Sequence, residues 1–149
     1  MAVSGSGLYV ATVVDVFDTT QLAIDLDLET HKGALFQNSI TPNFTTDTAY
    51  GVSPYNAGEV AGTNYTAGGK VLTGTTFTGS AGIATFDAAD LQWAASTITN
   101  ARCLLVYADA LTNNNAIVLL DFGGDYSTSN GDLDVVFNAA GLFYLDLVP

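Results

Sequence analysis

Short runs of apolar residues, separated by Gly, Asn and Ser, recur along the second half of the chain. Their spacing of roughly 8 to 12 residues is typical of the strands of a β-sandwich or barrel. The strands expected on this pattern are 71–78, 83–86, 91–94, 102–110, 116–122, 133–137 and 142–148. The pattern therefore predicts an all-β fold, an antiparallel β-sandwich that is either jelly-roll-like or Ig-like.

The first third of the chain holds two more candidate strands and one candidate helix. From Ile24 to Glu29 three aliphatic residues alternate with three acidic ones, which predicts a half-buried strand with a charged outer face. Residues 33–36 form a second short apolar run. Between Ser6 and Thr20 the apolar positions fit a short amphipathic helix, although the β-branched valines would also suit a strand.

From residue 38 to residue 65 the regular pattern gives way to Pro, Asn, Gly and Thr. A connection of this length without regular structure is uncommon in a compact domain and is typical of a functional or binding loop. The 149 residues of the chain are enough for one domain. We therefore expect an N-terminal arm or short helix at residues 1–21, and a single β-sandwich domain at 22–149 with a long loop at about 38–65.

The longest apolar runs predict which side chains fill the core. Cys103, the only cysteine, lies in one of these runs, so a disulfide framework is excluded and a buried, unreactive thiol is expected. The expected core residues are Leu104, Leu105, Val106, Ile117, Val118, Leu119, Leu120, Phe122, Val135, Phe137, Leu142, Phe143, Leu145 and Leu147.

Charge narrows the range of partners. The 15 acidic residues outnumber the three basic ones, Lys32, Lys70 and Arg102, and the net charge is −12. Binding to nucleic acid depends on clustered Lys and Arg, so nucleic acid is excluded as a partner and an anionic membrane surface is disfavoured. No apolar run approaches the ~20 residues of a membrane span, and residues 1–7 lack the features of a signal peptide, so synthesis in a cytosol is expected.

The residues that most often carry catalysis are scarce. His31 is the only histidine, and its position beside Lys32 at the edge of an expected strand predicts a solvated surface side chain. One His and one Cys are too few ligands to complete the coordination shell of a zinc ion. The sequence around His31 also has no pattern that would pair it, as a base, with a catalytic nucleophile.

Acidic residues lie close in sequence at three places, Asp87 with Asp90, Asp121 with Asp125, and Asp132 with Asp134. Such pairs can serve glycosidases, but close pairs arise by chance among 15 acids. Neither 121–125 nor 130–132 has the spacing of a calcium loop, and ordinary turn formation explains both. We expect no enzymatic activity, no metal and no cofactor.

The most distinctive string in the chain is EVAGTNYTAGGKVL, from Glu59 to Leu72. It resembles a segment of a widespread group of small structural proteins of tailed bacteriophages. Stretches 25–36, 86–93, 96–107 and 121–123 are similar to that group in the same order, so the likeness covers about residues 22 to 148. Its motifs are structural rather than catalytic, and Asn64 departs from a position where the group often has Gly.

The resemblance implies a virion protein, most often a capsid decoration protein on the outside of the head. Its partner would be the major capsid protein, and it would be made in the cytoplasm of the bacterial host. An acidic domain without disulfides or reactive groups fits this role, because a shell protein needs no chemistry and must not adhere to the packaged genome.

Two other functions stay open. The protein can belong to the tail, as a minor tail or adhesin-like module. It can also be a carbohydrate-binding β-sandwich, for which Trp93, Tyr50, Tyr55 and Tyr65 would supply the stacking platform. That function requires these rings to be exposed together on one face.

We assign attachment to the apolar stretch Leu8, Tyr9, Val10 and Val13, which is entered through the small residues 4–7. The alternative is that this stretch packs as a helix on an open edge of the domain. Self-association into a trimer or dimer is also expected, because several weak contacts hold a small domain better than one. The negative charge opposes association, so association should strengthen as salt screens it.

Overall fold

The computed structural model describes residues 2–18 and 22–148. Within these ranges the chain forms one helix, α1 (Val10–Phe17), and the strands β1 (Gly7–Leu8), β2 (Lys32–Phe36), β3 (Gly62–Thr63), β4 (Lys70–Val71), β5 (Thr76–Ser80), β6 (Ile83–Asp87), β7 (Leu91–Ile98), β8 (Ala101–Tyr107), β9 (Ala116–Tyr126), β10 (Gly131–Val135) and β11 (Phe143–Asp146).

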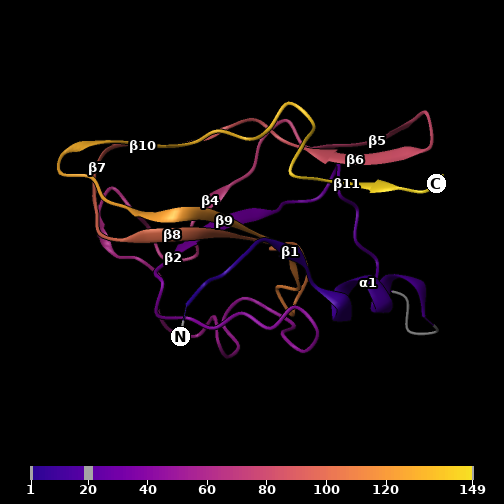
Figure 1. Cartoon of the computed structure of the whole chain (residues 1–149), viewed down its shortest axis with the longest axis horizontal. Coiled ribbons are helices and arrows are strands. Elements are labelled where there is room, and N and C mark those ends of the chain that lie inside the picture. The colour runs from indigo at the N-terminus through magenta and orange to yellow at the C-terminus, as the bar shows by residue number, and fades with distance from the viewer. Residues whose placement is uncertain (1, 19–21, 149) are drawn as a thin grey trace.

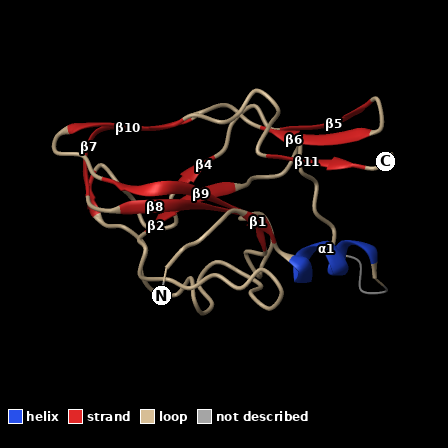
Figure 2. Cartoon of the chain, viewed as in Figure 1, coloured by secondary structure: helices blue, strands red, loops and turns tan. Residues whose placement is uncertain are grey.

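The strands form three antiparallel sheets, shown in Figure 2. The central sheet has the order β1-β9-β8-β2-β4, the second has the order β10-β7-β3, and the third has the order β11-β6-β5. The all-β fold expected from the sequence is confirmed, and a short N-terminal helix is present. It is shorter than the expected helix at 6–20, because Gly7 and Leu8 pair with β9 as strand β1 and the helix begins only at Val10. Of the expected helix, Thr19 and Thr20 lie outside the described residues.

One face of the central sheet packs against the second sheet. Leu104 and Val106 of β8 point to this side and belong to one buried cluster with Trp93 of β7 and Leu133 of β10. This cluster is the interior of the sandwich. Alternation along β8 places Cys103, Leu105 and Tyr107 on the opposite face of the sheet.

That opposite face is buried as well, although none of the sheets in the described part of the chain covers it. Ile40 and Tyr55 from residues 38–65, together with Val3 and Tyr9 from the N-terminal segment, pack against Leu105 in a second buried cluster. Figure 1 shows this part of the chain running beneath the central sheet. We call residues 38–65 the covering loop. It closes the second core, and its expected role as a binding loop stays a prediction.

The third sheet lies at one end of the sandwich, near the helix (Figure 1). The register pairs Phe77 with Phe86 and Phe86 with Phe143, so one face of this sheet carries a row of aromatic rings. Phe86 is fully buried and connects the third sheet to the sandwich core.

Several expected elements differ from the structure. Residues 24–28 form no strand, because the Asp25 carboxylate accepts the N–H of Asp27 and of Leu28 and folds the segment into a turn. The expected strand 71–78 is broken at Gly74, whose φ of +60° lets the chain leave the central sheet for the third one. The expected turn at Gly123–Gly124 is an irregularity in the register between β9 and β8, and β9 continues to Tyr126.

The core prediction holds for the inner strands and fails near the C-terminus. Leu104, Leu105, Val106, Ile117, Val118, Leu119, Val135 and Leu142 are buried. Leu120, Phe122, Phe137 and Phe143 are partly buried against the core. Leu145 and Leu147 are exposed by 38% and 67%, because Leu145 lies on β11, an edge strand of the third sheet, and Leu147 lies beyond the end of that strand.

Leu105→Asp should prevent folding, whereas Leu147→Asp should leave the folded state intact. Leu105 lies inside the second core, where an unpaired carboxylate costs several kcal/mol, a large share of the about 5–15 kcal/mol that stabilises a domain. Leu147 is solvated. Circular dichroism and thermal melts of both variants test this; a cooperatively folded Leu105→Asp variant would contradict it.

Candidate functional site

The helix α1 exposes its apolar side chains. Val10, Val13, Val14 and Phe17 are exposed, Phe17 by 82%, whereas the polar Thr12 is the buried residue of the helix. The Thr12 hydroxyl donates a hydrogen bond to the Ala116 carbonyl and so ties the helix to β9. A helix on the surface of a monomer normally turns its apolar side inward, so this orientation makes the exposed side of α1 a candidate binding surface.

An apolar groove of about 380 Å³ lies between α1, the segment 24–27 and the third sheet. Its apolar walls are formed by Leu8, Val13, Val16, Phe17, Ile24, Leu26, Phe77, Ile117, Phe143 and Leu145. Asp25 and Asp27 contribute the two carboxylates. A hydrogen bond between these two carboxyl groups lowers the pKa of Asp25 and raises that of Asp27. We call the groove and the exposed side of α1 the apolar face.

Sequence reasoning placed Leu8, Tyr9, Val10 and Val13 in an attachment site. The structure brings Leu8 and Val13 together in the groove and leaves Val10 exposed beside it. Tyr9 is different, since it is fully buried in the second core and its hydroxyl bonds that of Tyr55. Tyr9 therefore holds the segment to the domain and offers no surface for attachment.

Most of the apolar face was missed by sequence reasoning. Phe17 was visible as part of the amphipathic pattern of the helix. Phe77 and Leu145 could not be recognised from the sequence as surface residues, because each looks like an ordinary core position of a strand. Only the register of the third sheet brings Phe77, Phe143 and Leu145 to the same side as the helix.

The expectation of a solvated His31 is wrong. The side chain is fully buried, its Nε2 lies 3.0 Å from the Asp25 carbonyl oxygen, and its ring meets Phe86 edge-on at 5.9 Å. The turn at residues 25–28, which the sequence pattern did not predict, lies over it. Nδ1 has no hydrogen-bond partner among the residues that the structure describes.

The distinctive string from Glu59 to Leu72 folds around one carboxylate. Glu59 Oε1 accepts hydrogen bonds from the Tyr65 hydroxyl and from the Gly68 N–H, both at 2.7 Å, and Oε2 accepts one from the Tyr50 hydroxyl at 2.8 Å. Burial and these bonds raise the pKa of Tyr65 above its ordinary value and that of Tyr50 to about 12. The phenols therefore stay protonated and donate.

The same string is fastened to the central sheet. The Tyr65 hydroxyl accepts the N–H of Leu35 in β2 at 3.0 Å, and the Tyr107 hydroxyl donates to the Gly68 carbonyl at 2.8 Å. Tyr50 stacks on Tyr107 with ring centroids 4.5 Å apart. The string thus connects the end of the covering loop to the sheet, which is a structural role.

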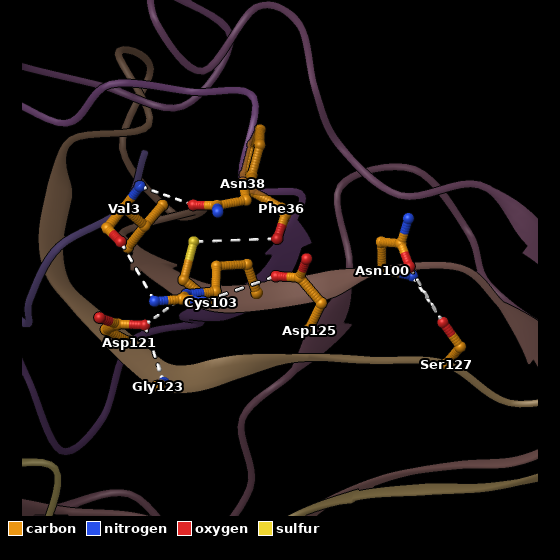
Figure 3. A network of polar contacts seen from close by, with 10 residues as sticks. Val3, Phe36, Asn38, Asn100, Cys103, Asp121, Gly123, Asp125 and Ser127 are labelled. Atoms are coloured by element: carbon orange, nitrogen blue, oxygen red, sulfur yellow. Dashed lines mark hydrogen bonds and ion pairs between the residues drawn. The ribbon is translucent and has the colours of Figure 1, made fainter. Parts of the chain in front are cut away.

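A second polar network holds the N-terminal residues (Figure 3). Arg102 Nε donates to Asp121 at 2.9 Å, its Nη1 lies 3.7 Å from Asp125, and its Nη2 donates to the Val3 carbonyl at 3.3 Å. The Val3 N–H donates to Asn38 Oδ1 at 2.8 Å. Asp121 and Asp125, one of the acidic pairs, are therefore counter-ions of Arg102.

The other acidic pairs also have structural contacts. Asp90 accepts the N–H of Phe137 and Asp87 that of Ala88. Asp132 accepts the N–H of Ala95, and Asp134 accepts the side-chain amide of Gln92. Among residues 2–18 and 22–148, no three His, Cys, Asp or Glu side chains lie together as a metal site would need.

The Cys103 thiol is buried, as expected. Burial, with a smaller contribution from Asp121, raises its pKa to about 12. At neutral pH it is a protonated thiol and a poor nucleophile.

The aromatic platform proposed for a carbohydrate does not exist. Trp93 and Tyr55 are buried, and they belong to different cores on opposite faces of the central sheet. The hydroxyls of Tyr50 and Tyr65 both donate hydrogen bonds to the Glu59 carboxylate. These rings therefore cannot stack together on a sugar, and this interpretation of the four residues is wrong.

No helix in the described ranges is both long and apolar enough to span a bilayer. Comparisons with protein-family models, with curated proteins and with solved structures gave no match.

Glu59→Ala should lower the free energy of unfolding by about 1–3 kcal/mol, because it leaves the partly buried Tyr65 hydroxyl and the Gly68 N–H without their acceptor. Urea denaturation of Glu59→Ala, Tyr65→Phe and the double variant measures the coupling between the two side chains. Additive effects of the two substitutions would contradict the role of Glu59 as the common acceptor.

Proposed function

We propose that the protein is a non-enzymatic structural protein of a tailed-bacteriophage virion, and that it is a decoration protein bound to the outside of the head. The observation that carries this proposal is the apolar face, on which valines and a phenylalanine of α1 stand exposed on an otherwise acidic domain. Exposed apolar surface of this kind is typical of a protein that is completed by assembly.

The placement of the charges supports the same role. Lys32 pairs with Asp109 at 3.0 Å, Arg102 pairs with Asp121, and the Lys70 ammonium bonds the Gln92 carbonyl. All three cations of the chain therefore have internal partners, and the outward field is negative. Such a surface repels DNA and does not compete with the packaging of a genome.

The fold of the resembling string adds a third argument. Glu59, Tyr65 and Gly68 form an internal brace rather than a reactive site. The residues that carry the likeness to phage structural proteins thus maintain the fold, as expected if the shared motifs are structural rather than catalytic.

The first test is where the protein resides in the particle. Heads and tails of the phage that encodes this chain are separated, and the chain is quantified in each by mass spectrometry against the major capsid protein. We expect a fixed ratio in heads and none in tails. Presence in tails alone would establish the minor tail alternative, and absence from both would refute a virion role.

The second test concerns attachment through α1. Val10→Ser together with Val13→Ser should abolish or strongly reduce binding to heads that lack the protein, because the substitutions remove exposed apolar area without burying a polar group. Ser and Val have similar helix propensities, so α1 should persist.

The matched control is Val52→Ser with Val136→Ser, two valines exposed by 51% and 73% on other parts of the surface. Co-sedimentation with heads measures binding for both double variants. Equal binding by the two would exclude α1 as the attachment surface.

A further inference from the structure

β5 differs from the other edge strands of the described chain. β1, β3 and β4 have only two residues each. β10 carries Asp132 and Asp134 and has an irregular register, and β11 carries Asp146. β5 has five residues with a regular register, no charge and no proline. Natural proteins protect long sheet edges by charge, proline or bulges, and β5 has none of these protections.

The free edge of β5 presents unpaired backbone groups. The hairpin to β6 turns through Ala81 and Gly82, whose φ values of +51° and +82° are typical of a two-residue type I′ turn. Ser80 and Ile83 then form a hydrogen-bonded pair, and the alternation along the ladder directs the N–H and C=O groups of Phe77 and Gly79 away from β6. All residues of β5 are exposed.

The absence of charge around β5 favours a second copy of this chain as the partner for this edge. Residues 71–86 carry no charged side chain, and in the third sheet only Asp87 and Asp146 are charged. Two copies of a chain with a net charge of −12 repel each other over most of their surfaces. At β5 they can approach closely without placing carboxylates opposite each other.

Gly79 supplies a second, independent observation. Its φ is not in the left-handed region, and a Cβ added there would meet no atom closer than 3.9 Å. Neither the backbone conformation nor the packing within a single chain thus requires glycine at position 79. Antiparallel pairing of two β5 strands about a two-fold axis at Thr78 would place Phe77 of each copy opposite Gly79 of the other. A phenyl ring packing over an edge glycine of the neighbouring strand is a stabilising cross-strand arrangement.

We propose that two copies of this chain dimerise through β5, so that their third sheets become one continuous antiparallel sheet. The interface is isologous and closed, since each copy contributes the same strand. Phe77, which is exposed by 40% in the single chain, gains its contact with Gly79 of the second copy. This proposal concerns the purified protein and does not depend on the proposed role in a virion.

The test uses the full chain alone, with analytical ultracentrifugation over a range of protein concentrations and at low and high salt. We expect a monomer–dimer equilibrium that shifts toward dimer as salt screens the negative charge. Gly79→Val should raise the dissociation constant by about tenfold or more, because the new side chain occupies the space of the ring. Gly131→Val is the matched control, an edge-strand glycine with open space around it.

Thr78→Lys provides a second variant if Gly79→Val affects folding. It places two ammonium groups opposite each other at the two-fold axis and should abolish the dimer, although it lowers the overall negative charge. Thr112→Lys, exposed in a loop, makes the same change of net charge and should leave dimerisation unchanged.

Hydrogen exchange measures directly whether the free edge of β5 becomes hydrogen-bonded. The amide protons of Phe77 and Gly79 should become protected as the protein concentration rises, and those of Thr63 on the short edge β3 should not. A protein that stays monomeric at all concentrations, forms trimers, or dimerises equally well with Gly79→Val and Thr78→Lys would overturn the proposal.

Discussion

The central sheet is apolar on both faces, and both faces have to be covered by other parts of the chain. A second sheet covers one face, whereas the other face is covered by irregular chain, the covering loop and the N-terminal residues. Irregular chain has no hydrogen-bonded ladder of its own, so it needs side-chain anchors. Glu59 and Arg102 are these anchors, and both are charged groups that accept or donate several hydrogen bonds at once.

This arrangement explains which parts of the fold could be predicted. β8 and β9 were expected because a strand buried on both faces reads as an uninterrupted apolar run, as in Cys103 to Val106. The second core was not expected, because its covering residues occur singly. Ile40 and Tyr55 stand among Pro, Asn and Gly, and no periodicity marks them as buried.

Errors near the helix have one common cause. The alternation from Ile24 to Glu29 is a good strand pattern, but local hydrogen bonds of the Asp25 carboxylate to two backbone N–H groups favour a turn over the extended conformation. Once that turn exists, His31 is covered and the groove beside α1 has its third wall. The hydrogen bonds of one carboxylate, which favour a turn over a strand at residues 25–28, thus determine both the burial of His31 and the shape of the groove.

The position of Cys103 makes its thiol a natural probe of motion in the covering loop. The thiol lies on the face of the central sheet that the covering loop closes, with Ile40 and Tyr55 in the same cluster, and it is buried. A reagent can therefore reach it when the loop lifts, without separation of the two sheets of the sandwich. The rate of thiol modification would measure the opening of this half of the molecule separately from global unfolding.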